Sequence, residues 1–107
     1  MAMKDCIDAC DTAHRACTEA AIHGMQQGGK LADWELIQLL LDCADITETA
    51  ADFMLRSSRM HQSVCRVTAE ICDKCADSCE QFAAHDLRMK QCAEACRRAA
   101  TNCRKLL

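Results

Sequence analysis

The sequence predicts an all-α protein, an antiparallel up-down four-helix bundle with a cysteine-lined core. Three observations support this prediction. The chain has no proline and only three glycines, so few residues interrupt a helix. Most of its eleven cysteines follow one another at steps of three, four or seven residues, which separate neighbours on one helix face. Four stretches of helical pattern joined by short turns form one bundle, so residues 1–107 are predicted to be a single domain.

The first helix is predicted over residues 3–26. The stretch QQGG at residues 26–29 provides its C-terminal stop and the first turn. Small residues occupy its inward face, so that a neighbouring helix can approach closely. This face consists of Cys6, Cys10, Ala13, Cys17, Ala20 and Gly24.

The second helix is predicted over residues 34–56, with Asp33 as its N-cap. Its inward face consists of Leu36, Leu40, Cys43, Thr47, Ala50 and Met54. A second apolar strip lies on the opposite side of this helix. A helix in a small bundle that is apolar on two faces usually has a second partner, so this strip is predicted to be a subunit interface. The strip is formed by Trp34, Ile37, Leu41 and Leu55.

The third helix is predicted over residues 60–84, capped by Ser57 or Ser58, and carries four cysteines at steps of seven, three and four. His61 lies on the same face as these cysteines. The fourth helix is predicted over residues 87–105, with Asp86 as N-cap. Its cysteines have the steps of four and seven that also occur in the first helix. The cysteines concerned are Cys65, Cys72, Cys75 and Cys79 in the third helix and Cys92, Cys96 and Cys103 in the fourth.

Charge and hydropathy restrict the partners. A net charge of −3 and a pI near 5.7 argue against nucleic acid, which requires a basic patch. No apolar run approaches the ~18 residues of a membrane span, so no membrane association is expected. The first residues, MAMKDCIDAC, lack the apolar segment of a signal peptide, so a cytoplasmic location is expected.

Reduced thiols are predicted, because helical neighbours four residues apart do not readily meet disulfide geometry.

A thiol-lined core can be inert packing, since a free cysteine behaves as a small buried hydrophobe. Ten thiols aligned on three helices, with one more on the remaining helix, favour a metal instead. Thiolates select Cu(I), Zn(II) or iron–sulfur clusters. Zinc and iron–sulfur sites usually take their cysteines from turns or loops, and here only Cys72 and Cys75 resemble half of such a site. Cu(I) accepts as few as two or three soft ligands, and about one Cu(I) per thiolate leaves a buried column neutral.

Multiple Cu(I) ions are therefore the predicted cargo. The predicted ligands are Cys6, Cys10, Cys17, Cys43, Cys65, Cys72, Cys75, Cys79, Cys92, Cys96 and Cys103, with His61 and Met54 as entry ligands. Met60 near the same mouth, and His23, Met25, His85 and Met89 near the other, are further entry candidates.

An antiparallel arrangement also predicts the level of each thiol along the bundle. One end is expected to hold Cys6, Cys65 and Cys103 with Met54 and His61. The middle is expected to hold Cys10, Cys43, Cys72 and Cys96, and the other end Cys17, Cys75, Cys79 and Cys92.

The cysteine patterns cover essentially the whole chain in the segments CIDACDTAHRAC, LLLDCADITETAADFM, CRVTAEICDKCADSC and QCAEACRRAATNC. In these segments the chain resembles the cysteine-rich four-helix-bundle copper storage proteins of bacteria, in particular their cytosolic branch. The resemblance implies a homotetramer of bundles that load Cu(I) into the core through a mouth carrying His or Met. Ala13, Thr47 and Ala99 occupy inward positions where a richer member would carry cysteine, which implies a lower capacity.

The predicted function is the binding and storage of multiple Cu(I) ions, for storage or detoxification. The alternative is a zinc-binding or metal-free structural thiol bundle. An enzyme is not expected. The chain has no Glu-x-x-His pair of the kind that di-iron bundles use, and the pair Cys72 and Cys75 lies in mid-helix rather than at the helix N-terminus that favours a reactive thiol.

Overall fold

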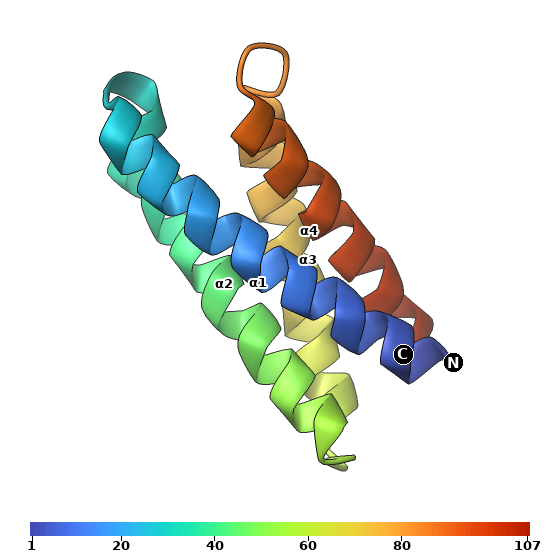
Figure 1. The fold of residues 1–107 in the computed structure, drawn as a ribbon. Helices are drawn as coiled ribbons and strands as arrows, with labels where there is room; N and C mark the ends of the chain where they lie inside the picture. Colours follow the sequence, from blue (N-terminus) through green and yellow to red (C-terminus); the bar gives the residue numbers. More distant parts are fainter.

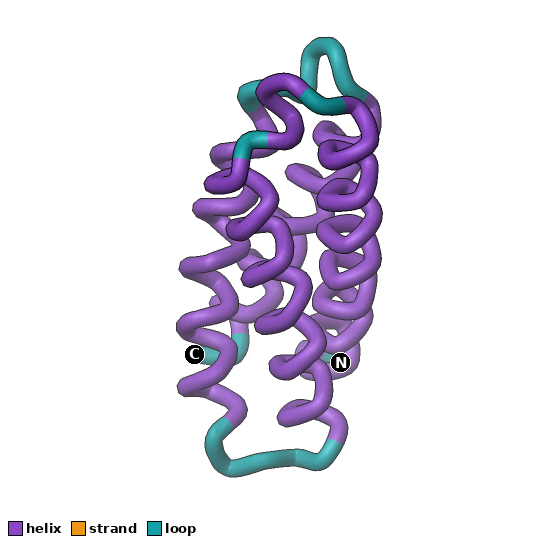
Figure 2. The backbone as a smooth tube through the Cα atoms, turned by 90° about the vertical axis from the view of Figure 1, so that its left-hand side faces the viewer, coloured by secondary structure: helices purple, strands orange, loops and turns teal.

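The computed structural model describes residues 1–107 as a four-helix bundle. The helices are α1 (Ala2–Gln27), α2 (Trp34–Leu55), α3 (His61–Glu80) and α4 (Leu87–Lys105), with a 3₁₀ turn, η1 (Gly29–Ala32), between the first two. Successive helices run in opposite directions and are joined by short connections (Figure 1). The two termini lie near the same end of the bundle, and the turn between α2 and α3 extends beyond them (Figure 2). The predicted fold class is confirmed.

The helix boundaries agree with the predicted ones to within one residue, except at the end of α3. This helix ends at Glu80 rather than near residue 84. Residues 81–85 instead form tight turns, in which Phe82 N–H donates to the Cys79 carbonyl and His85 N–H to the Phe82 carbonyl. Because these bonds span three residues instead of four, the chain reverses direction before α4 begins.

Of the predicted N-caps Asp86 and Asp33, only Asp86 makes the capping hydrogen bond. The carboxylate of Asp86 accepts a hydrogen bond from Met89 N–H at 3.0 Å, so this N-cap is as predicted. The side chain of Asp33 makes no capping hydrogen bond at α2, because the η1 turn directly before it sets the entry of the chain. Helix α3 starts at His61, one residue later than predicted, and Ser58 Oγ accepts a hydrogen bond from Met60 N–H just before it.

Small residues on α1 allow close packing at its C-terminal end. Gly24 is buried, and a Cβ atom at this position would lie 2.3 Å from the Leu31 carbonyl oxygen of η1. Such a distance is far below van der Waals contact, so the approach of η1 to α1 requires glycine.

The bundle interior contains no charged side chain. The buried side chains are hydrophobic or thiol-bearing, apart from the hydroxyls of Thr47 and Thr68. At the end where α2 and α4 begin, the core is closed by Leu36, Leu40 and Met89, which are all buried. Phe82 and Leu31 pack against the core there.

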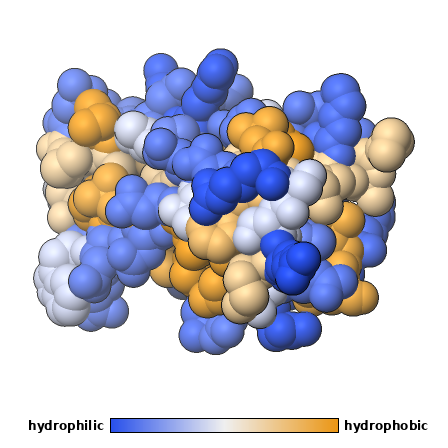
Figure 3. Space-filling model, turned by 90° about the horizontal axis from the view of Figure 1, so that it is seen from below, coloured by the Kyte–Doolittle hydropathy of each residue, from blue (hydrophilic) through white to orange (hydrophobic).

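Seen from below, the exterior shows hydrophilic residues interspersed with hydrophobic patches (Figure 3). Charged residues on it form ion-pair networks. Arg97 on α4 donates to Glu80 at 2.8 Å and to Asp73 at 3.2 Å on α3, and Arg104 also pairs with Asp73. These basic residues of α4 therefore join two helices. None of the four helices combines the length and apolar composition that a membrane span requires.

Candidate metal centre

All eleven cysteines are free and fully buried, with no exposed side-chain surface. The helical steps in the sequence place them on the inner faces of the four helices. Each predicted inward position of α1 and α2 is also buried. Several buried residues were not predicted. They include Thr68 on α3, whose position four residues before Cys72 could have revealed it, and alanines on all four helices such as Ala9, Ala44, Ala69 and Ala93.

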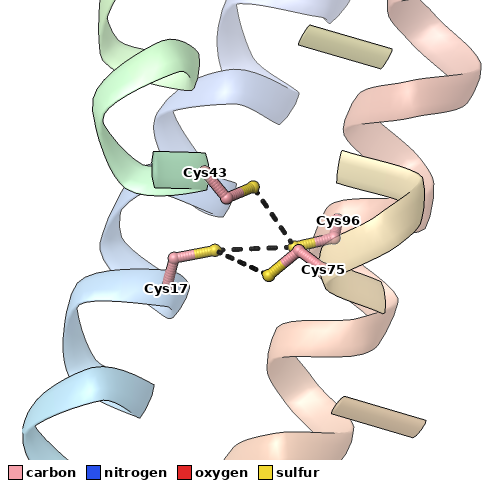
Figure 4. A group of neighbouring side chains, drawn as sticks. All are labelled: Cys17, Cys43, Cys75 and Cys96. Carbon is pink, nitrogen blue, oxygen red and sulfur yellow. Dashed lines mark hydrogen bonds between the residues drawn. The ribbon is translucent and has the colours of Figure 1, made fainter. Parts of the chain in front are cut away.

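Four thiols, one from each helix, converge near the middle of the bundle: Cys17, Cys43, Cys75 and Cys96 (Figure 4). Their sulfur atoms all lie within 4.8 Å of one another. The Sγ atom of Cys17 lies 3.5 Å from that of Cys96 and 4.0 Å from that of Cys75. Cys43 and Cys96 are 3.8 Å apart.

Three further thiols extend this cluster. Cys72 lies 3.6 Å from Cys43, and Cys92 lies 3.5 Å from Cys17. Cys79 forms a trio with Cys75 and Cys92. We call the seven thiols the central group, and its members are Cys17, Cys43, Cys72, Cys75, Cys79, Cys92 and Cys96.

The other four thiols lie toward the end that holds the chain termini. Cys103 is 3.5 Å from Cys6 and 3.9 Å from Cys10. The thiols of Cys6 and Cys103 are near enough to that of Cys65 to shift its pKa, and its S–H contacts the Met54 sulfur at 3.9 Å. We call these four thiols the terminal group: Cys6, Cys10, Cys65 and Cys103.

The predicted levels of three thiols are wrong. Cys10 was expected in the middle but lies beside Cys103. Cys17 and Cys75 were expected toward one end but lie in one cluster with Cys43 and Cys96. The reason is the displacement of α1 along the bundle axis relative to its neighbours. Side-chain contacts determine this displacement. For example, the His14 imidazole bonds the Ala44 carbonyl at 2.7 Å and so aligns α1 with α2.

His61 and Met54 lie beside the terminal group, as predicted. The Nδ1 atom of His61 is 2.8 Å from the Ser58 carbonyl oxygen. Because a carbonyl only accepts, Nδ1 carries the proton, and the Nε2 lone pair has no hydrogen-bond partner. His61 is partly exposed, and its charge when protonated adds to the effect of the neighbouring thiols in lowering the pKa of Cys6. Met54 is buried in contact with Cys65.

The entry candidates at the opposite end are arranged differently. His23 Nε2 lies 2.8 Å from a carboxylate oxygen of Asp86, whose other oxygen caps α4. Although burial raises the pKa of Asp86, the bonds from His23 and from Met89 N–H hold it below its usual range. Met25 lies on the outer surface and His85 is exposed. This end therefore has its histidine and aspartate engaged in holding the fold.

Hydrogen bonds between thiols shift their pKa values in opposite directions. Interactions with the Cys17 and Cys72 thiols lower the pKa of Cys43 below the ordinary 9.0. The same interactions, together with burial, raise the pKa values of Cys17 and Cys72. For Cys65, the bond from Cys103 lowers the pKa, but the bond to Cys6 and burial outweigh it and raise the pKa to about 11.

The same pattern holds throughout both groups. The pKa values of Cys6 and Cys92 are lowered, because several neighbouring thiols donate to each of them. The pKa values of the remaining thiols are raised, and these are Cys10, Cys17, Cys65, Cys72, Cys75, Cys79, Cys96 and Cys103. Most of the thiols thus keep their protons until a cation displaces them.

The sulfur separations suit a metal ion. With metal–sulfur bonds of about 2.3 Å, three sulfurs in a triangle lie about 4.0 Å apart and four in a tetrahedron about 3.8 Å apart. The observed separations of 3.5–4.0 Å match both geometries. Charge discriminates between the ions. A zinc tetrathiolate carries two negative charges, and no charged side chain is buried to balance them, whereas Cu(I) thiolates at one ion per sulfur are neutral.

Comparison with known proteins identifies the family. The family model described as copper storage protein matches residues 1–107. The chain belongs to the copper storage protein family. The resemblance seen in the cysteine patterns is therefore confirmed, and with it the predicted copper-storage function.

Solved structures of similar proteins support this assignment. The Nmul_A1745 protein of Nitrosospira multiformis is 42% identical, with a TM-score of 0.91 over 98% of this chain and 94% of that one. The Cu(I)-bound copper storage protein BsCsp3 of Bacillus subtilis is 28% identical, with a TM-score of 0.89 over 98% and 97%. A cytosolic copper storage protein of Streptomyces lividans, with five coppers, is 31% identical, with a TM-score of 0.91 over 99% and 92%.

Proposed function

We propose that this chain stores multiple Cu(I) ions as thiolate clusters inside the bundle, with all eleven cysteines as ligands. The observation that carries this proposal is the composition of the core, which buries every thiol and no charged side chain. Neutral clusters with up to about one Cu(I) per thiolate satisfy such a core, and every cysteine then has a use.

Copper enters, in this proposal, at the end that carries His61 and Met54. The Nε2 lone pair of His61 is free, the Met54 sulfur contacts Cys65, and both side chains lie beside the terminal group. Imidazole and thioether bind Cu(I) without a negative charge, so they can pass the ion to thiolates without retaining it. At the other end, the buried Leu36 and Leu40 close the core, the Met89 thioether is fully buried, and His23 is bonded to Asp86 rather than free.

An anaerobic Cu(I) titration of the reduced protein against a competing chromophoric chelator tests the storage proposal. Tight binding of many ions, approaching eleven per chain, is expected. Saturation at one or two ions would instead favour a zinc-binding or metal-free thiol bundle. A parallel Zn(II) titration provides the comparison, and it is expected to saturate at a much lower stoichiometry.

We also propose that the bundles form a homotetramer in which the outer face of α2 provides one of the contacts and pairs two copies. Trp34 is 67% exposed and Leu41 43% exposed, and together with Ile37 they line a hollow of about 500 Å³. Leu55, at the far end of α2, is also exposed. Apolar surface of this kind is typical of a contact between subunits. The occupant that we propose is the same face of a second copy.

Light scattering on the eluting protein tests the assembly. Trp34→Glu is expected to convert the oligomer to smaller species. Leu87→Glu is the matched control, because Leu87 on α4 is also 67% exposed but lies outside this hollow. A monomeric wild-type protein would contradict the proposal.

A cytoplasmic location, which the cytosolic relative from Streptomyces lividans supports, is tested by cell fractionation.

A further inference from the structure

The thiol contacts fall into two sets that do not overlap. In the terminal group, Cys103 contacts Cys6 at 3.5 Å and Cys10 at 3.9 Å. In the central group, Cys17, Cys43 and their neighbours lie 3.5–4.0 Å apart. No thiol–thiol hydrogen bond of the structure joins a cysteine of one group to a cysteine of the other. The sulfur column is therefore interrupted.

Each helix contributes a fully buried residue without sulfur between the two groups. On α1 and α4 these residues are Ala13, between Cys10 and Cys17, and Ala99, between Cys96 and Cys103. On α3 the residue is Thr68, between Cys65 and Cys72, and on α2 it is Thr47, between Cys43 and Met54. We call these four residues the spacer layer.

The spacer layer offers no ligand to Cu(I). The alanines present only methyl groups. Thr47 Oγ1 donates to the Cys43 carbonyl at 2.7 Å, and Thr68 Oγ1 donates to the Val64 carbonyl at 2.7 Å. Both hydroxyls are thus bonded back to their own helices, and a neutral hydroxyl oxygen is a hard donor that Cu(I) does not favour.

We propose that the copper store is divided into two separate Cu(I)–thiolate clusters, a four-cysteine terminal cluster and a seven-cysteine central cluster, isolated by the spacer layer. This inference rests on the proposed storage function. A metal–thiolate cluster grows by sharing sulfurs between ions, and the spacer layer removes the shared sulfurs between the two groups. Each cluster therefore fills and empties as its own unit, and central copper has to pass the terminal cluster and the spacer layer to reach the mouth.

Trypsin separates the two groups into different peptides, which gives a direct test. The terminal cysteines fall in residues 5–15, 60–66 and 99–104, and the central ones in residues 16–30, 31–56, 67–74, 75–88 and 91–97. The anaerobic protein is loaded with increasing Cu(I), its unprotected thiols are alkylated, and the peptides are quantified by mass spectrometry. Protection is expected to rise together within each group, in two steps at different copper-to-protein ratios.

A pair of variants on α1 sharpens the test. Ala13→Cys places a sulfur in the spacer layer, and Ala20→Cys places one on the same buried face beyond Cys17. Both alanines are fully buried, so the two substitutions have similar packing costs. Ala13→Cys is expected to merge the two protection steps into one, while Ala20→Cys leaves two. Thr47→Cys, which changes side-chain volume little, provides a second bridging variant if Ala13→Cys misfolds.

The outcomes separate this inference from the storage function. Parallel protection of all eleven cysteines in the wild-type protein would overturn the division and leave copper storage standing. Two steps that persist unchanged in both Ala13→Cys and Thr47→Cys would show that the spacer layer does not cause them, which also overturns the inference. The absence of protection at any copper ratio would instead remove the storage function itself.

Discussion

Replacing Cys96 by alanine tests whether a central cysteine serves copper or the fold. The Cys96 sulfur lies 3.5 Å from that of Cys17 and 3.8 Å from that of Cys43, and its side chain is fully buried. Removing it leaves neighbours that are themselves thiols, so no strongly polar group loses its only partner. The expected result is a folded protein with a smaller copper capacity.

The cost to the metal-free protein follows from the loss of one buried atom. A group the size of a methylene contributes about 0.8 kcal/mol when buried. A void no larger than a sulfur atom adds about 0.5 kcal/mol at ~24 cal/mol per Å³. The free energy of unfolding is thus expected to fall by roughly 1–1.5 kcal/mol, with a decrease in Tm of about 4–8 °C per kcal/mol for a domain of this size.

The assay combines thermal unfolding of the metal-free protein with the chelator-competed Cu(I) titration. Ala99→Gly is the matched control, because Ala99 is fully buried one turn from Cys96 on α4 and carries no sulfur. Glycine in a helix interior costs about 1 kcal/mol, so the control loses similar stability without losing a ligand. Cys96→Ala is expected to bind about one Cu(I) fewer than the wild-type protein, while Ala99→Gly keeps the full capacity. Unfolded Cys96→Ala, or an equal loss of copper in both variants, would refute the reasoning.

Three further predictions follow from the structure. His61→Ala is expected to slow copper loading and removal in stopped-flow measurements without changing the final capacity. His85→Ala, at the opposite end, is the control and leaves the rates unchanged. Rates in His61→Ala equal to those of the wild-type protein would remove His61 from the entry path. Copper loading at neutral pH is expected to release protons, because thiols with raised pKa values must ionise to bind. Apparent copper affinity therefore falls as the pH is lowered, and proton-neutral binding in a weakly buffered titration with a pH indicator would contradict thiol ligation. Gly24→Ala is expected to lower the free energy of unfolding by about 1–3 kcal/mol, because the new Cβ would lie 2.3 Å from the Leu31 carbonyl oxygen. This overlap outweighs the gain of about 1 kcal/mol that alanine brings in helix propensity. An increase in Tm would show that η1 moves aside freely.

The inward face of each helix could be deduced from the sequence because helical periodicity is a local property. Steps of three, four and seven residues fix which side chains share a face, whatever that face packs against. The burial of Cys6, Cys17 and Cys43, and the exposure of Trp34 on the opposite strip, followed in this way. The N-cap at Asp86 could also be predicted from the sequence, because it depends only on that residue and its near neighbours in the chain.

The offsets between the helices could not be deduced in the same way, because contacts between residues distant in the sequence decide them. The bond of His14 to the Ala44 carbonyl and the approach of η1 to Gly24 set how far α1 is displaced along its neighbours. That displacement moved Cys10 into the terminal group and Cys17 into the central group.

The sequence by itself thus determined that the chain forms a bundle and that its thiols face inward, since both depend on a repeat along a single helix. Only the tertiary structure decided which thiols meet, because three or four sulfurs form a cluster only when different helices bring them to one level. It also placed the fully buried residues Ala13, Thr47, Thr68 and Ala99, one from each helix, between the two groups of thiols. The division of the sulfur column is therefore a property of the packed bundle, which no single helix contains.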